Sequence, residues 1–406
     1  MSRLTVFVIV SITAVLIGLF LVFSFGPTRK APIDGTASET GQKPQFPKIT
    51  PKASGGIKAA PPNEYEVAGA EPKPYENYAV VKVFYATDRR RTASRKASKT
   101  YGVKRDVLSY GICEVSIPRD HRMGEMERPV VWKLEFREDP KKHVVLLSVT
   151  QQDEKDFFKS INERIEESPG SNAFVFVHGF NTSFAAAARR TAQMTYDLGF
   201  KGAPVFYSWP SQGTTQGYPI DEANVEWSQE NLKTFLQEFA KTTRAENIFL
   251  VAHSMGNRAL TGALSDLYVE NAGLRGRFNE VILAAPDIDA DVFKRDIAPR
   301  IVTDEPSVTL YASSQDEALK ASKTFHGYPR AGDSYEGLII KPGIETIDST
   351  DVKTDFLGHS YFAQSNSIIA DIFALISSRK RAAERPGLRP IKAQGSIYWK
   401  IEPAAP

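Results

Sequence analysis

Ser254 stands where an apolar run meets a helix-forming run, in the stretch AHSMG at residues 252–256. The preceding residues NIFLVAH are typical of a buried strand, and the residues that follow are typical of a helix. Ala252 and Gly256 are small, as a sharp strand-to-helix turn requires, although Ala252 replaces the first glycine of the usual G-x-S-x-G pattern. Such a turn presents the serine hydroxyl beyond the end of a sheet, so the spacing predicts a nucleophile for acyl transfer. A plain tight turn is the alternative.

A serine hydroxyl needs a general base, and the base needs an orienting acid. The chain has six histidines, of which two fall in suitable places. His359, in FLGHSYF, follows the last predicted strand and opens the last predicted helix, which places it at the same edge of the sheet as Ser254. His326, in TFHGYPR, falls within a long loop and is the alternative. We therefore predict His359 as the base.

Two acidic segments compete for the role of the orienting acid. Asp316, in SSQDEAL, follows the second strand beyond the serine, and Asp287, in APDIDAD, follows the first. Both satisfy the chain order serine, aspartate, histidine. Position favours Asp316, with Asp287 as the alternative, and capping of the following helix is the competing structural role of either aspartate.

A tetrahedral intermediate also needs backbone donors for its oxyanion. The N–H of Met255, the residue after the serine, is one expected donor. The other is expected in the loop after the strand NAFVFV, where Gly179 leaves the backbone uncrowded, so the Phe180 N–H is the candidate and Asn181 the next. Helix capping is the competing role of Asn181. His178 is expected to hold this loop by hydrogen bonding.

The rim of the pocket is expected from two loops rich in glycine and aromatic residues, WPSQGTTQGYP at 209–219 and TFHGYPRAGDSYEG at 324–337. Trp209 is a candidate pocket wall, with a buried core position as the alternative. The segment between the first two strands beyond the serine has room for one helix and not for a lid domain. We therefore expect short or soluble esters as substrates, without interfacial activation.

Strand and helix patterns alternate along the chain from residue 172 onward. Strands are predicted at 77–87, 108–118, 130–138, 143–150, 172–180, 203–210, 247–253, 280–286, 307–313 and 343–349. Helices are predicted around 159–165 and at 183–198, 221–242, 255–270 and 359–377. Apolar strands that alternate with helices predict an α/β fold with a mostly parallel sheet and helices on both faces. The earliest strands are predicted to be antiparallel. Ligands bind beyond the carboxyl ends of such strands, where the predicted triad residues fall.

The chain resembles the α/β-hydrolase superfamily in the motifs VFVHGFN, AHSMG and FLGHSYF. It is most similar to a bacterial esterase- or lipase-like family formerly catalogued as a domain of unknown function (DUF900-type). The further motifs that carry this similarity are FYATDRR, YGICEVSIP, YSWPS, PDID and SQDEAL, over about residues 78–378. The resemblance implies the α/β-hydrolase fold and a triad of Ser254, Asp316 and His359, the same residues that position favours.

These residues predict a serine hydrolase that cleaves carboxylic esters through an acyl-enzyme intermediate. The expected partner is a small ester or acyl substrate, and neither a metal nor an organic cofactor is required. The alternatives are an acyltransferase that uses the same triad and a catalytically silent scaffold tethered to a membrane. The sequence carries no signal for an oligomeric state.

Composition narrows the class of protein. The 406 residues carry a formal net charge of +3, which argues against a dedicated nucleic-acid-binding protein. The single cysteine, Cys113, excludes an intramolecular disulfide and is expected to be buried in a strand.

The two ends of the chain differ from the middle. Residues 4–25 are uncharged and long enough to cross a bilayer, so residues 1–26 are predicted as a transmembrane anchor, with a cleaved signal peptide as the alternative. Residues 27–76 are predicted as a flexible linker and 77–378 as the α/β-hydrolase domain. Residues 379–406 are predicted as a basic, proline-containing tail that is solvated, with contact to anionic lipid head groups as the alternative. The protein is then a single-pass membrane protein, with its catalytic domain predicted on the extracytoplasmic, periplasmic side.

Overall fold

The protein is described by a computed structural model that covers five ranges of the chain, 77–129, 137–303, 308–352, 365–393 and 395–402. The predicted anchor, the predicted linker and His359 lie outside these residues, as does most of the strand expected at 130–138. None of the helices in the described ranges combines the length and the apolar character needed to cross a bilayer.

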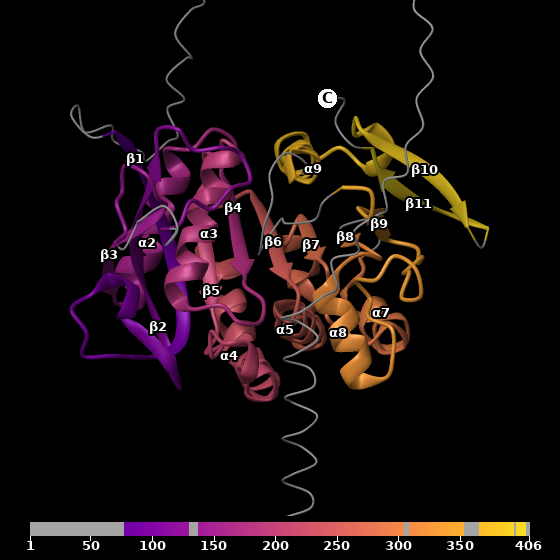
Figure 1. Ribbon diagram of the computed structural model, residues 1–406, viewed down its shortest axis with the longest axis horizontal. Helices are drawn as coiled ribbons and strands as arrows, with labels where there is room; N and C mark the ends of the chain where they lie inside the picture. Colours follow the sequence, from indigo (N-terminus) through magenta and orange to yellow (C-terminus); the bar gives the residue numbers. More distant parts are fainter. Residues whose placement is uncertain (1–76, 130–136, 304–307, 353–364, 394, 403–406) are drawn as a thin grey trace, which may run out of the picture. The chain divides into compact units, whose positions relative to one another are not determined.

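A single mixed sheet organises the described part of the chain (Figure 1). Its eleven strands lie in the order β10-β11-β9-β8-β7-β6-β4-β5-β1-β2-β3. The strands are β1 Tyr78–Arg91, β2 Tyr101–Pro118, β3 Val145–Gln152, β4 Asn172–Val177, β5 Ala203–Ser208, β6 Asn247–His253, β7 Glu280–Ala284, β8 Val308–Ala312, β9 Ile344–Asp348, β10 Leu388–Ala393 and β11 Ser396–Ile401. Across the sheet, every neighbouring pair in the series β1-β5-β4-β6-β7-β8-β9-β11 is parallel. The strands β2, β3 and β10 are antiparallel to their neighbours. The predicted mostly parallel sheet, with antiparallel strands on its N-terminal side, is confirmed.

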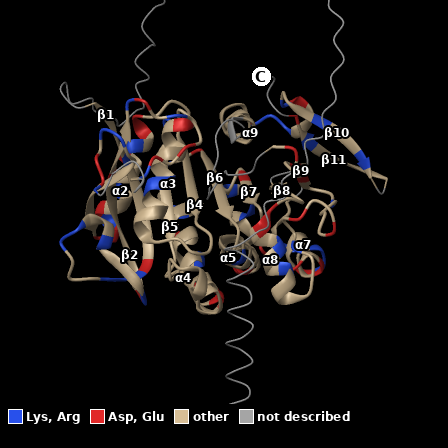
Figure 2. Cartoon of the chain, in the orientation of Figure 1, with Lys and Arg blue, Asp and Glu red and all other residues tan. Residues whose placement is uncertain are grey.

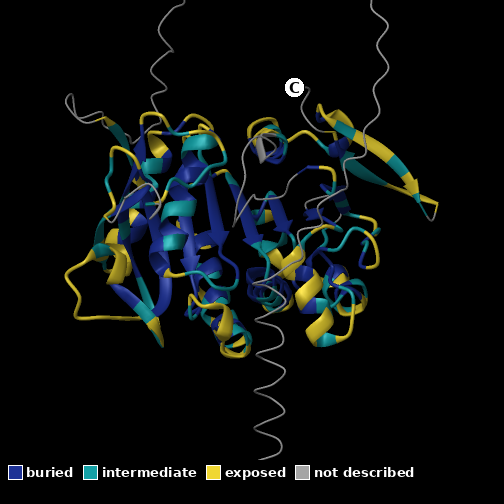
Figure 3. Cartoon of the chain, in the orientation of Figure 1, coloured by how far each residue is buried: buried dark blue, intermediate teal, exposed yellow. Residues whose placement is uncertain are grey.

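Helices cover both faces of this sheet. The longer ones are α2 Glu154–Glu166, α3 Phe184–Asp197, α4 Tyr218–Thr242, α5 Gly256–Glu270, α8 Glu317–His326 and α9 Ser365–Ser378. Val175 and Val177 of β4 pack into one core with α2, α4 and α5, whereas Phe174 and Phe176 pack into a second core with α3 and α9. Because side chains alternate along a strand, a strand buried on both faces is apolar throughout, as the dark blue centre of the sheet in Figure 3 shows.

The C-terminal segment differs from the prediction. The described residues between 382 and 402 form no solvated tail, because β10 and β11 pair and continue the sheet beside β9. Arg385 is only 3% exposed. Its guanidinium lies 3.2 Å from Asp371 and 3.5 Å from Glu345, so a residue expected in solvent is paired inside the domain. The domain therefore extends beyond the predicted boundary at 378, and its first described strand begins at Tyr78.

Charged residues of both signs are interspersed over the helices and loops (Figure 2), in keeping with the nearly balanced composition. Cys113 is fully buried in β2, as expected. The fold thus brings the carboxyl ends of β1, β5, β4, β6, β7, β8 and β9 to one edge, where the predicted site residues must be found.

Candidate active site

Ser254 occupies a strained turn between β6 and α5. Its φ of +49° lies in the left-handed region, which a residue with a side chain adopts only when its surroundings hold it there. The Ser254 N–H donates to the Ala284 carbonyl at 2.9 Å. Its own carbonyl accepts from the Asn257 amide at 2.8 Å and from the Asp287 N–H at 3.3 Å. The predicted sharp strand-to-helix turn is therefore present, with the geometry of a nucleophile elbow.

The elbow packs directly against the loop that follows β4. A methyl group on Gly256 would lie 2.3 Å from the His178 carbonyl oxygen, and one on Gly179 would lie 3.0 Å from the Ser254 Cβ atom. Both positions therefore require glycine. Ala252 lies within β6 and is fully buried, so its methyl group packs into the core where the usual pattern has its first glycine.

The two predicted oxyanion donors flank this turn. Met255 is the N-cap of α5, and the first N–H groups of a helix have no partner within it. In the described part of the chain, no acceptor is recorded for the backbone N–H of Met255 or of Phe180. The Gly179 carbonyl bonds to the His178 Nδ1 atom at 2.8 Å. Because a trans peptide points its C=O and its N–H in opposite directions, the Phe180 N–H is turned away from the buried His178 ring.

Asn181 fills neither of its predicted roles. Its backbone N–H donates to the Asp221 carboxylate at 3.4 Å, so it has an acceptor already. The cap of α3 is Ser183, whose hydroxyl accepts from the Ala186 N–H at 3.2 Å. Asn181 instead turns the chain, with a φ of +55°.

His178 holds the loop, as the sequence predicts. Its Nε2 atom lies 3.2 Å from the Ser208 hydroxyl and 3.4 Å from the Arg89 guanidinium. Burial and the charge of Arg89 lower the pKa of His178 to about 3, so the ring stays neutral.

Trp209 belongs to the core, and the prediction of a pocket wall is wrong. Its side chain is fully buried. The indole stacks on the His178 ring at a centroid distance of 5.0 Å, and its N–H donates to the His178 carbonyl at 2.7 Å. Trp209 therefore supports the loop after β4, which carries the predicted donor Phe180, from inside the protein.

Two charged residues that the sequence did not single out also support this loop. Arg89, at the end of β1, is 1% exposed, and Asp221, in α4, is fully buried. The Asp221 carboxylate accepts from the Ser211 hydroxyl at 2.6 Å and from the Gln212 N–H at 2.7 Å. Arg89 lies in the motif FYATDRR, but a charged residue is expected at the surface unless its partners are known.

Asp316 lies beyond the end of β8, where the acid is predicted. It is the N-cap of α8, and its carboxylate accepts from the Leu319 N–H at 3.0 Å. Burial raises the pKa of Asp316. Asp316 therefore caps α8, and its catalytic role stays a prediction.

Asp287 cannot serve as the alternative acid. Its first carboxylate oxygen accepts from Ser322 at 2.5 Å and from Arg330 at 2.8 Å, and its second from Tyr218 at 2.9 Å and from Arg258 at 3.0 Å. Burial alone would raise the pKa of Asp287, but the two guanidinium groups outweigh it and hold the pKa low. Four donors from protein side chains leave no place for a catalytic histidine.

The two predicted rim loops meet through Tyr218. Its ring lies 5.0 Å from Phe180, 5.8 Å from Phe325 and 6.0 Å from His326, measured between ring centroids. The His326 nitrogens are both engaged, Nε2 with Glu222 at 2.8 Å and Nδ1 with the Ser322 carbonyl at 2.8 Å. His326 is thus a structural residue of the rim.

No histidine of the described residues has a recorded hydrogen bond to the Ser254 hydroxyl. His121 lies between Glu127 and Asp197, and His143 accepts from the Asp139 N–H. His253 lies on the α3 face of the sheet, the face of Val251, because side chains alternate along β6. His359, the predicted base, lies outside the described ranges.

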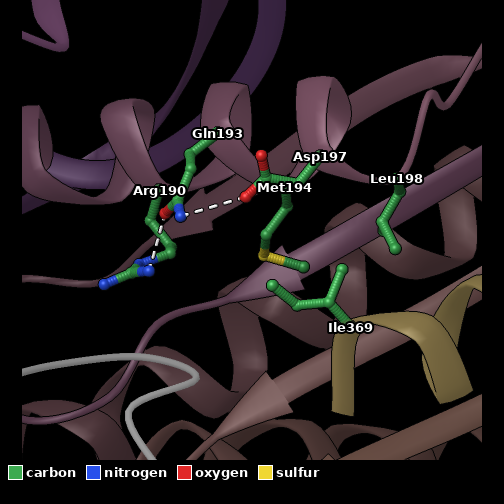
Figure 4. A pocket seen from close by; sticks show the side chains of 6 residues that line it. All are labelled: Arg190, Gln193, Met194, Asp197, Leu198 and Ile369. Atoms are coloured by element: carbon green, nitrogen blue, oxygen red, sulfur yellow. Dashed lines mark hydrogen bonds between the residues drawn. The ribbon is translucent and has the colours of Figure 1, made fainter. Parts of the chain in front are cut away.

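A recess lies between α3 and α9 (Figure 4). Its lining residues are Arg190, Gln193, Met194, Asp197, Leu198 and Ile369. None of them is a predicted site residue.

Over the described ranges, no group of three or more His, Cys, Asp or Glu side chains is arranged to hold a metal ion.

Comparison with known proteins gives one informative match. Residues 153–379, more than half of the chain, match the family model described as "Alpha/beta hydrolase of unknown function (DUF900)". A search of curated proteins finds no match.

Two solved structures show weak likeness. Lipase B of Aspergillus fumigatus is 12% identical, with a TM-score of 0.28 over 45% of this chain and 45% of that one. A structure from a study of two prolyl endopeptidases is 12% identical, with a TM-score of 0.29 over 68% of this chain and 35% of that one. The match thus spans less than half the length of either solved structure, and at these TM-scores neither carries the functional argument.

Proposed function

Because the chain belongs to the family of alpha/beta hydrolases of unknown function (DUF900), we propose that it is a serine hydrolase that cleaves carboxylic esters. The observation that carries the proposal is the strained elbow at Ser254, with a φ of +49°. Strain of this kind is retained where the surrounding structure enforces it, and such positions cluster at functional sites. Two backbone N–H groups without a recorded acceptor in the described residues, those of Met255 and Phe180, flank the same turn.

In the proposed mechanism, the Ser254 hydroxyl attacks the ester carbonyl carbon while His359 accepts its proton. The oxyanion of the tetrahedral intermediate accepts hydrogen bonds from the Met255 and Phe180 N–H groups. His359 then returns the proton to the leaving alcohol, and an acyl-enzyme remains on Ser254. Water then attacks the acyl-enzyme carbonyl carbon while His359 accepts its proton, and the bond to Ser254 breaks as His359 returns that proton to the serine oxygen and the carboxylic acid leaves. Asp316 orients the imidazole throughout.

The assignment of His359 as the base rests on its sequence position and on elimination. His121, His178 and His326 each have both ring nitrogens engaged, and His253 lies on the face of β6 that packs against α3. His143 lies beside Ser116 of β2, which three strands separate from β6. The assignment of Asp316 over Asp287 is supported by the four side-chain donors that surround Asp287.

The substrate is proposed to be a short or soluble ester. This rests on the connection between β7 and β8, in whose described residues the helical elements are the small turns α6 Ala290–Val292 and α7 Ala298–Ile301 around a five-residue π-type turn. The domain is proposed to be tethered by residues 4–25 on the extracytoplasmic side, as the sequence predicts.

The test is covalent labelling of the full-length protein with a fluorescent fluorophosphonate, which reacts with activated serines. We expect labelling of the wild type and none of Ser254→Ala. We expect His359→Ala and Asp316→Asn to slow labelling strongly. The matched controls are His326→Ala and Asp287→Asn, folded samples of which should still label. A folded wild type that neither labels nor hydrolyses acetate or butyrate esters would favour the scaffold alternative.

A further inference from the structure

Arg89 is a buried charged residue that forms hydrogen bonds with the loop after β4, residues 178–182, which is the oxyanion loop of the proposed site. It lies near the end of β1, and it is 1% exposed. Its Nε atom donates to the Ser208 hydroxyl at 2.8 Å. Its Nη1 atom donates to the Gly102 and Ser211 carbonyls, both at 3.0 Å. Its Nη2 atom donates to the Thr182 carbonyl at 2.7 Å and lies 3.4 Å from the His178 Nε2 atom. All five donors of the guanidinium therefore point at neighbouring strands and loops.

A guanidinium donates hydrogen bonds and accepts none, and this decides the tautomer of His178. Because Arg89 faces the Nε2 atom, that nitrogen must be the acceptor, and the ring proton must sit on Nδ1. The Nδ1–H then donates to the Gly179 carbonyl at 2.8 Å. The opposite tautomer would place two lone pairs face to face at this contact.

The direction of the Gly179 carbonyl sets the direction of the next N–H. When His178 holds this carbonyl inward, the Phe180 N–H of the same trans peptide is directed outward. We propose that Arg89 is a positioning residue, which fixes the His178 tautomer and thereby aims the Phe180 N–H at the oxyanion. This inference rests on the proposed function, since it assigns a role within that same site.

Side chains hold the loop on two sides, Arg89 on one and Asp221 on the other. Arg89 binds its Thr182 carbonyl, while the Thr182 N–H donates to the Ser211 hydroxyl at 3.0 Å. Asp221 accepts from that hydroxyl and from the Asn181 N–H. Asp88 and Asp221 lie near enough to counter the charge of Arg89, whose pKa burial lowers to about 10. The guanidinium therefore stays charged at neutral pH and keeps donating.

The test compares substitutions at Arg89 with the same substitution at its neighbour. Arg89→Met removes all five donors, and Arg89→Lys keeps the charge but loses the planar fork. Arg90→Met is the matched control, because the Arg90 side chain is 57% exposed and pairs only with Asp106 in the described residues. Ser208→Ala is a milder variant, which removes one hydroxyl shared by Arg89 and His178.

Three quantities are measured on full-length proteins: kcat and KM for a short ester, the inhibition constant of a trifluoromethyl ketone, and the ¹⁵N shifts of His178. The ketone forms an oxyanion on the serine, so its affinity reports donor alignment. For Arg89→Met we expect kcat to fall about 10- to 100-fold with KM nearly unchanged, somewhat less than the loss of a whole oxyanion donor. The ketone affinity should fall by the same factor, and the ¹⁵N shifts should move from the Nδ1–H tautomer toward a mixture.

The outcomes separate this inference from the proposed function. A folded Arg89→Met protein with wild-type kcat, ketone affinity and ¹⁵N shifts would overturn the role of Arg89. If Arg89→Met does not fold, Arg89→Lys and Ser208→Ala must show smaller changes in the same direction, and unchanged values in both would also overturn it. If the wild type shows no hydrolysis and no ketone binding, the proposed function fails, and with it the oxyanion role of Arg89. The ¹⁵N shifts would then still report whether Arg89 fixes the His178 tautomer.

Discussion

His121 should make the stability of the domain depend on pH in the alkaline range. Its side chain is 2% exposed and lies between two carboxylates. The Nδ1 atom is 2.9 Å from the Glu127 carboxylate, and the Nε2 atom is 2.7 Å from the Asp197 carboxylate. The contact between His121 and Asp197 joins the loop after β2 to the end of α3. Burial alone lowers the pKa of His121, but the hydrogen bonds and charges of Asp197 and Glu127 outweigh it and raise the pKa to about 9.

The magnitude follows from this shift. The pKa rises from 6.5 to about 9 on folding, and one pKa unit corresponds to about 1.4 kcal/mol, so protonated His121 stabilises the fold by about 3 kcal/mol. Because the folded pKa is the higher one, the full contribution is present below about pH 6.5. It declines as the pH rises and is lost above about pH 9.

The perturbation is His121→Gln, which keeps a polar side chain and removes the charge. We expect the variant to be about 3 kcal/mol less stable than the wild type at pH 6 and to approach it near pH 10. The assay is urea unfolding followed by tryptophan fluorescence at five pH values between 6 and 10. Asp197→Asn is the second variant, and because it removes one of the two carboxylates, its pH dependence should shift to lower pH.

The result that refutes this reasoning is a difference between wild type and His121→Gln that stays constant from pH 6 to pH 10. A constant difference would mean that the histidine contributes packing and neutral hydrogen bonds only. Since other groups titrate equally in both proteins, the difference isolates the histidine.

Three further predictions concern the site. Gly256→Ala should abolish fluorophosphonate labelling and lower the free energy of unfolding by about 1–3 kcal/mol, because the new methyl group meets the His178 carbonyl at 2.3 Å. Asp287→Asn should lower that free energy by about 3–5 kcal/mol in urea unfolding, because it breaks buried ion pairs with two arginines, yet folded protein should still label. Trp209→Phe should cost about 1–3 kcal/mol in calorimetry, because the His178 carbonyl loses its indole partner. Equal stability of any of these variants and the wild type would contradict the corresponding contact.

The sequence predicted the local elements well, because their signals are local. Apolar runs marked the parallel strands, and the pattern around Ser254 marked the turn that the structure shows with a positive φ. The role of His178 as a support of the loop was also predictable, since its place after a strand and before a glycine is visible in the chain.

Errors arose where the environment of a polar or amphipathic side chain decided the outcome. Arg385 carries the same charge in solvent and in the domain, and only its contacts with Asp371 and Glu345 show that it is buried. Trp209 could equally have lined a pocket, and its bond to the His178 carbonyl places it in the core. Such contacts join residues that are far apart in the chain.

By itself, the sequence determined the order in which the strands follow one another along the chain and the small residues around the elbow. It also determined the edge of the sheet at which Ser254 lies. These features depend on neighbouring residues and on the period of the hydrophobic pattern. Only the tertiary structure decided that Asp287 is saturated by four side-chain donors and that Arg89 is buried against the His178 ring. The physical reason is that a charged group is stable inside a protein only when distant segments supply its partners, and those partners meet only in the folded chain.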